Sequence, residues 1–196
     1  MRLTNFHNLP DIVVDALSTN HYSRGESDIS ITSLIDSPRV KLLQEKHDEA
    51  MEQDVSEMIW SSFGTAVHHL FEERAGLHGE DVISEERIFA ESNGWTISGA
   101  IDLQQIEDGA VVISDYKVTS VWSVIFGKKE WETQLNCYAG LVRMAKQMPV
   151  KELRIIAVLR DWQRRKAQME DTYPQSPITV VNIPMWSEQE AFDYLD

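Results

Sequence analysis

Asp102, Asp115 and Lys117 are the residues whose types and positions first suggest chemistry, because each interrupts an otherwise apolar segment. Asp102 stands in SGAIDL, and Asp115 and Lys117 stand in VVISDYK. Two carboxylates can hold a divalent cation, and an amine beside them adds a fixed positive charge. Whether the three side chains meet depends on the elements that carry them.

A three-stranded antiparallel meander is predicted to carry these residues. The three strands are rich in isoleucine, valine and aromatic residues and span residues 85–92, 95–103 and 110–117. An Asn-Gly dipeptide at 93–94 separates the first two, and an Asp-Gly dipeptide at 108–109 separates the second and third. Both dipeptides are typical of two-residue hairpin turns.

The turns also predict which side chains face one another. Counting back from the second turn places Asp102 directly across from Asp115, and Lys117 points to the same face. Facing carboxylates, with Cβ atoms ~4.5–5.5 Å apart, repel each other. A divalent cation would remove this repulsion, whereas two solvated acids partly neutralised by Lys117 are the simpler alternative. The first turn places Glu85 on the other side of Asp102, provided that no β-bulge intervenes.

Helices and two further strands are predicted around the meander. Helical spacing covers residues 11–17, 40–53, 56–80 and 130–147, and a last helix opens at Ser187 with Glu190 in the capping-box position. Strands are predicted at 152–162 and 178–184. In the helix at 56–80, six apolar residues recur at spacings of three and four and predict a buried face: Ile59, Phe63, Ala66, Val67, Leu70 and Phe71. This order of elements indicates an α/β sandwich with a mixed sheet.

The composition limits the class of protein. A chain of 196 residues with 42% hydrophobic and 26% charged residues is typical of one globular domain, here 1–196 with an irregular segment at 1–28. Its 18 basic and 32 acidic residues give a net charge of −14, which argues against coating nucleic acid by bulk charge. The single cysteine, Cys137, excludes an intramolecular disulfide and a four-cysteine zinc or iron–sulfur site. The chain shows no long apolar run and no leader-like start, so we expect a cytoplasmic protein without a membrane partner.

The combined motifs resemble the PD-(D/E)XK nuclease superfamily, and within it the RecB-like, phage exonuclease-like branch. Four motifs in the family's order carry the resemblance: Gly64-x-x-x-His68, Gly99-x-x-Asp102, Asp115-Tyr116-Lys117 and Gln134-x-x-x-Tyr138. The resemblance covers about residues 60–140. It implies a restriction-endonuclease-like core in which helices flank a mixed sheet.

The resemblance implies a metal site for one or two Mg²⁺ or Mn²⁺ ions. The implied ligands are His68, Asp102, Asp115 and the backbone carbonyl of Tyr116. A further acidic residue of the family pattern has three candidates in this sequence: Glu72, Glu85 and Glu86. An iron–sulfur cluster, which some branch members hold with four cysteines, is not possible here.

Catalytic roles are implied for three other side chains. Lys117 would orient the attacking water or help to deprotonate it, and would stabilise the developing charge. Gln134 and Tyr138, one helical turn apart, would support Lys117 or contact the DNA backbone. Taken singly, Gln134 and Tyr138 also fit a polar residue and a core aromatic residue, and His68 fits an ordinary helical histidine.

Local positive charge could offset the acidic composition where DNA binds. Four basic residues lie in RDWQRRK at 160–166, where Trp162 could stack on a base, although a solvated loop is an equally good interpretation. Lys128 and Lys129 precede the helix of Gln134 and could contact a phosphate.

Two functions remain in view. The resemblance implies a metal-dependent DNA nuclease, most simply a RecB-like exonuclease or DNA-end-processing enzyme of phage or bacterial origin. The alternative is a non-catalytic DNA- or protein-binding module that keeps the nuclease fold and relies on a basic protein partner. An unrelated enzyme is disfavoured, because the sequence shows no glycine-rich phosphate loop, nucleophile elbow or Cys–His pair.

Overall fold

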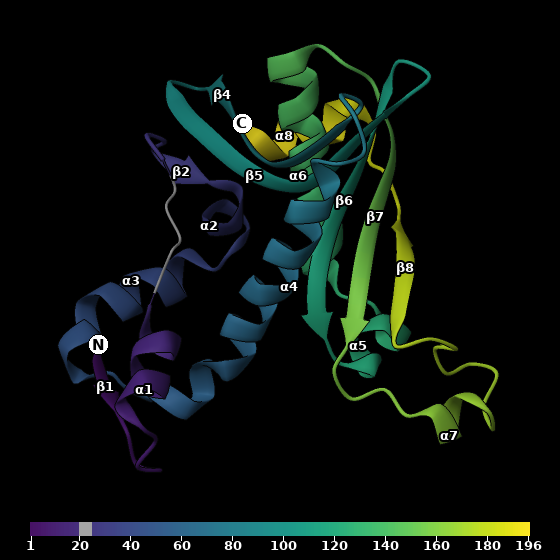
Figure 1. Cartoon of the computed structure of the whole chain (residues 1–196). Coiled ribbons are helices and arrows are strands. Elements are labelled where there is room, and N and C mark those ends of the chain that lie inside the picture. Colours follow the sequence, from purple (N-terminus) through teal and green to yellow (C-terminus); the bar gives the residue numbers. More distant parts are fainter. Residues whose placement is uncertain (20–24) are drawn as a thin grey trace.

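The protein is built on a mixed β-sheet with helices on both faces, seen in a computed structural model that describes residues 1–19 and 25–196 (Figure 1). Within these residues the main sheet has six strands: β2 (Ile29–Ser30), β4 (Val82–Ser92), β5 (Trp95–Glu107), β6 (Ala110–Thr119), β7 (Val150–Leu159) and β8 (Ile178–Ile183). The strand order is β2-β5-β6-β7-β8, and β4 also pairs with β5. β6 and β7 are parallel, whereas β4, β5 and β6 form an antiparallel meander.

Helices cover the faces of the sheet and also form a group beside it (Figure 1). They are α1 (Asp11–Ser18), α2 (Ile31–Ile35), α3 (Pro38–His47), α4 (Ile59–Ala75), α5 (Val121–Phe126), α6 (Lys129–Lys146), α7 (Arg164–Ala167) and α8 (Glu188–Leu195). Two 3₁₀ turns, Asp48–Ala50 and Val55–Met58, flank a short strand β3 (Glu52–Asp54), which pairs in parallel with β1 (Arg2–Thr4) as a separate small sheet. The structure thus confirms the predicted mixed α/β class, with α1 and β1 lying inside the segment expected to be irregular.

Both hairpin turns form as the dipeptides predict. Asn93 and Gly94 have φ of 47° and 80°, and Asp108 and Gly109 have φ of 53° and 78°. Positive φ at both central residues belongs to the turn that matches the twist of a hairpin. The pairing of β5 with β6 runs in the predicted register from the turn back to the pair of Leu103 and Ser114.

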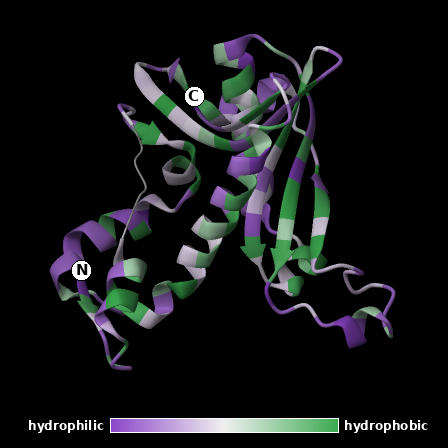
Figure 2. Cartoon of the chain, in the orientation of Figure 1, coloured by the Kyte–Doolittle hydropathy of each residue, from purple (hydrophilic) through white to green (hydrophobic). Residues whose placement is uncertain are grey.

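α6 is the central helix of the core. Every residue from Thr133 to Val142 is buried, as expected for a helix covered on all sides. The sheet lies on one side of α6 and α8 lies on another (Figure 1). β7, whose residues are predominantly apolar, runs through the same core, whereas α3 and α7 are largely hydrophilic (Figure 2).

Three sequence expectations need correction. The helix predicted at 40–53 ends at His47, and the segment 121–126 is a helix that the sequence did not indicate. The predicted buried face of α4 is largely exposed at Ile59, Phe63 and Leu70, because α4 contacts the sheet chiefly through its later turns. Among the described residues, no helix combines the length and apolar character needed to cross a membrane.

Candidate active site

The site lies where β5 and β6 separate. Their ladder ends at Leu103 and Ser114, one residue short of the two aspartates. There the carboxylate of Asp102 accepts a hydrogen bond from the backbone N–H of Tyr116 at 2.7 Å. Asp102 and Asp115 are both buried. The side chain of Asp102 therefore occupies the gap that opens between the two strands.

α4 supplies His68 to this gap. Its Nε2 lies 2.9 Å from the Tyr116 carbonyl oxygen, which can only accept, so Nε2 donates. In the neutral ring Nδ1 then keeps its lone pair, and it lies 3.5 Å from Glu85 Oε1 and 3.6 Å from Asp102 Oδ2. A backbone carbonyl that fixes the histidine tautomer in this way is typical of metal-binding histidines.

His68, Glu85 and Asp102 form a group that fits a divalent cation. One donor atom from each lies within 4.8 Å of the other two. Glu85 Oε1 is buried and has no hydrogen-bond donor among the described residues. A buried carboxylate oxygen without a partner is costly. A cation between the three side chains would satisfy it, so the residues present fit the metal that the sequence suggested.

The geometry distinguishes the three glutamate candidates. Glu85 has a positive φ of 50°, a conformation that is rare for a residue with a side chain and is found at functional sites. Glu86, its neighbour, instead contacts Lys146 and Gln104. Glu72 is exposed and lies 3.5 Å from His69. Glu85 alone of the three joins His68 and Asp102.

A second group adjoins the first and is centred on Asp115. Lys117 Nζ lies 2.8 Å from Asp115 Oδ2. From α6, Gln134 Nε2 donates to Asp115 Oδ1 at 3.0 Å and lies 2.9 Å from the Tyr138 hydroxyl. Gln134 thus holds Asp115 directly, and Tyr138 contacts Gln134.

Gly99 allows α6 to approach β5 at this point. A Cβ at Gly99 would lie 2.7 Å from Cε1 of Tyr138 and 2.9 Å from Cδ1 of Leu141. These separations are far below van der Waals contact, so only glycine fits. Close packing against α6 therefore explains why the Gly99-x-x-Asp102 motif begins with glycine.

The two groups are electrostatically coupled. Burial, followed by the nearby charge of Asp115, raises the pKa of Asp102 to about 7, although His68 opposes the shift. Burial opposes the charged form of His68, yet Glu85, Asp102 and Asp115 raise its pKa above 6.5. Mutual repulsion of this kind is what a bound cation would relieve.

Lys117 remains protonated in this environment. Burial alone would lower the pKa of Lys117, but the adjacent Asp115 carboxylate outweighs it and raises the pKa above its ordinary value. A protonated lysine can donate hydrogen bonds and stabilise negative charge, but it cannot accept a proton.

The predicted basic run lies away from the metal candidates. Trp162 donates from Nε1 to the Pro174 carbonyl at 2.7 Å and packs against the core, so it holds a loop rather than presenting a free ring. Arg160 lies over the ring of Trp60 at 4.9 Å. α7, which carries the other three basic residues, extends from the end of the sheet (Figure 1).

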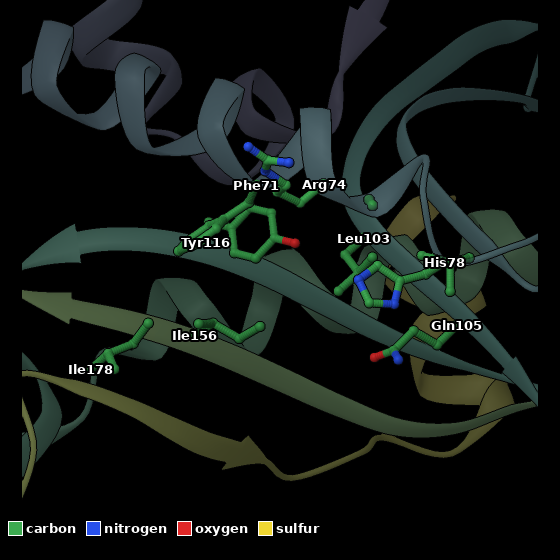
Figure 3. A pocket seen from close by; sticks show the side chains of 10 residues that line it. Phe71, Arg74, His78, Leu103, Gln105, Tyr116, Ile156 and Ile178 are labelled. Carbon is green, nitrogen blue, oxygen red and sulfur yellow. The ribbon is translucent and has the colours of Figure 1, made fainter.

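Two cavities adjoin the site. One, of about 310 Å³, lies between α4 and the sheet, with Phe71 and Tyr116 packed together and His78 near Gln105 (Figure 3). Of the candidate metal ligands, only Tyr116 lines this cavity, through its ring. The other, of about 500 Å³, is lined by Lys117 and Gln134 and by Lys128 and Lys129.

Comparisons with known proteins agree with this geometry. Matches to solved structures include the one titled "Crystal structure of SSO0001", with 15% identity, a TM-score of 0.62, and coverage of 94% of this chain and 82% of that chain. At this identity the likeness concerns the fold alone. No curated protein sequence matches. The model of the PD-(D/E)XK nuclease superfamily matches residues 37–175, which include every predicted site residue, and the chain belongs to this superfamily.

Proposed function

We propose that the protein is a divalent-metal-dependent DNA nuclease that hydrolyses phosphodiester bonds, as a RecB-like exonuclease or DNA-end-processing enzyme. The observation that carries the proposal is the convergence of His68, Glu85 and Asp102 within 4.8 Å, directly beside the pair of Asp115 and Lys117. Superfamily membership supports nuclease chemistry in general. The geometry supplies the residues that would perform it here.

His68, Glu85 and Asp102 would hold the metal, with Asp115 and the Tyr116 carbonyl as further predicted ligands. When bound, Mg²⁺ or Mn²⁺ activates water near neutral pH and neutralises charge on the phosphate and leaving oxygen. Carboxylates suit both ions, and the imidazole favours Mn²⁺. The Tyr116 carbonyl already accepts from His68, but a carbonyl oxygen has a second lone pair.

Lys117 would stabilise the negative charge that develops on the phosphate. Its ammonium is held by Asp115, and Asp115 is held in turn by Gln134. Because this chain of contacts is already formed, the positive charge needs no rearrangement during the reaction. Asp115 would therefore position Lys117 and, as a further predicted ligand, would also contact the metal.

The alternative of a non-catalytic module receives no support from the site. Asp102, Asp115 and Lys117 are all present, and Gln134 holds Asp115 in place. A module that only bound DNA or a partner would gain nothing from burying acids that repel one another.

DNA digestion under defined metal conditions tests the proposal. We expect linear DNA to be degraded with Mg²⁺ or Mn²⁺, with EDTA abolishing the activity. Asp115→Asn and Lys117→Ala should each lower kcat by at least about 10²-fold, the usual cost of removing a group that stabilises the transition state. Lys151→Ala is the matched control, because Lys151 pairs with Glu107 at the surface.

The same assay separates modes of cutting. An exonuclease degrades linear DNA and spares circular and end-blocked DNA, whereas an endonuclease cuts all three. Absence of digestion with every divalent ion, or full activity in both site variants, would contradict the proposed function.

A further inference from the structure

A lysine-lined cavity of about 500 Å³ opens directly beside the active site. Lys117, Lys128 and Lys129 all line it. In the part of the chain that the structure describes, neither Lys128 nor Lys129 has a carboxylate oxygen within 4 Å, although Glu130 also lines the cavity. Two lysines without acidic partners are notable in a chain with 32 acidic residues.

The helix that begins at the cavity strengthens this positive character. Lys128 and Lys129 occupy the first positions of α6, where the helix dipole disfavours cations and favours anions. Lys128 Nζ lies 5.8 Å from the centre of the Trp131 ring. The first turn of α6 also carries Glu130 and Glu132, but the two lysines stand at its uncapped start, where the free backbone N–H groups are suited to a phosphate group.

A pair of exposed aromatic rings stands next to the cavity. Trp122 and Phe126 lie one turn apart on α5, with ring centroids 5.7 Å apart and planes 14° from parallel. Their side chains are 52% and 79% exposed. Rings that are stacked on each other but open to solvent present a face on which a further flat, apolar group can stack.

α5 is fixed in this position by the fold. Asp161, just past the end of β7, accepts a hydrogen bond from the Val121 N–H at 2.7 Å. At the other end, Gly127 follows Phe126 directly, lines the same cavity as Lys117, and has a φ of 69°. The aromatic pair is thus joined to the lysine cavity through Gly127, which directly follows Phe126 and directly precedes Lys128.

We propose that α5 and the lysine cavity form a track for single-stranded DNA, with a backbone phosphate at Lys128 and Lys129 and unpaired bases stacked on Trp122 and Phe126. The inference rests on the proposed nuclease function and names its substrate class. Positive charge interleaved with exposed aromatic rings is the usual composition of single-strand binding surfaces. Inside a duplex the base faces are covered by their neighbours, so the aromatic pair is open only to unpaired bases or to the terminal pair of a blunt end.

Binding measured without cleavage tests the track. Fluorescence anisotropy with a labelled oligothymidine and with a hairpin-capped duplex would be measured in an Asp115→Asn background. Replacing Trp122 and Phe126 by alanine should raise the Kd for the single strand roughly 5- to 100-fold, the range for loss of base stacking. The Kd for the capped duplex should change less than twofold.

Three further variants test which property of the surface is responsible for binding the single strand. Leucine at both aromatic positions keeps apolar area but removes the ring faces, so it should weaken binding nearly as much as alanine. Lys128→Ala with Lys129→Ala should reduce the salt slope of binding by about 0.7, the value for one phosphate of a single strand. Trp95→Ala is the matched control, because Trp95 is 57% exposed but lies seven residues, roughly 23 Å of strand, from Asp102.

The outcomes separate this inference from the proposed function. Unchanged single-strand binding in the aromatic variants, or an equal loss for a blunt duplex whose terminal pair stacks on the rings, overturns the track even if DNA is digested. If the leucine variant kept its DNA binding and its oligomeric state shifted, the aromatic pair would be a protein contact. That result would also overturn the track. Loss of binding alongside no digestion would keep the track and reject the nuclease.

Discussion

At the scale of single residues, the site concentrates acids that oppose one another. Glu85 adopts a left-handed conformation and leaves a buried oxygen without a donor, and Asp102 has its pKa raised to about 7 by burial and by Asp115. Strain and unpaired charge of this kind cost stability and persist where function requires them. A cation bound between these residues would offset both costs.

Glu85 and its neighbour Glu86 provide a matched pair for testing this assignment. Glu85→Gln should raise the Mn²⁺ concentration needed for half-maximal activity by roughly 10- to 100-fold, as for other losses around metal sites. Glu86→Gln removes the contact with Lys146 and should leave the metal requirement unchanged. Calorimetric titration with Mn²⁺ checks both variants without relying on activity. Equal metal dependence in the two variants would exclude Glu85 as a ligand.

At the scale of elements, the approach of α6 to β5 decides whether the site is assembled. Gln134 on α6 reaches Asp115, with Tyr138 beside it, because Gly99 on β5 leaves room for the Tyr138 ring. The closest atoms belong to an aromatic ring inside the core, so a side chain at Gly99 forces the ring or the helix to move. The packing of α6 therefore also fixes the position of Asp115.

Gly99→Ala should therefore damage stability and activity together. Overpacking a buried position costs about 1–3 kcal/mol, and displacement of Tyr138 should also lower kcat by misplacing Asp115. Urea denaturation and kcat measured on the same preparation check the two effects. Gly76→Ala is the control, because a Cβ there meets nothing within 4 Å. Normal kcat in a destabilised Gly99→Ala protein would show that α6 does not position the site.

At the scale of the whole molecule, the N-terminal helices and small sheet form a separate group beside α4 (Figure 1). Asp54 ties this group together. Its carboxylate accepts from the Ser56 hydroxyl and N–H and from the Phe6 N–H. These hydrogen bonds, that of the Ser56 hydroxyl first, lower the pKa of Asp54 to about 2.

This lowered pKa predicts how the N-terminal group responds to acid. The folded form holds the Asp54 carboxylate more acidic than the value of 3.8 expected in the unfolded chain. Its stabilising effect is therefore complete above about pH 4 and is lost as the pH falls toward 2. Asp54→Asn should lower the urea midpoint at pH 6 and flatten its decline in acid. An unchanged acid profile would show that Asp54 does not stabilise the folded protein.

Much of the meander could be predicted because its determinants are local. The Asn-Gly and Asp-Gly turns impose positive φ at adjacent residues, and a two-residue turn leaves the strands one register. Asp102 and Asp115 consequently had to lie near each other. The capping box of α8, formed by Ser187 and Glu190, is equally local and was also predicted.

Other features depended on contacts between distant parts of the chain. The sequence could not choose between Glu72, Glu85 and Glu86, because the choice depends on a left-handed residue in β4 and on where α4 places His68. It also suggested Lys117 or the DNA backbone as the partner of Gln134, whereas the docking of α6 directs that side chain to Asp115. α5 escaped prediction because it has only six residues, five of them aromatic or β-branched, and so short a segment does not show a helical period.

Residue types and turn chemistry by themselves determined that two acids and a lysine would share one region of a sheet, because those effects act over a few neighbouring residues. Only the tertiary structure decided which glutamate and which histidine nitrogen join them. Those positions follow from the packing of α4 and α6 on opposite faces of the sheet, and such packing depends on residues far apart in the chain.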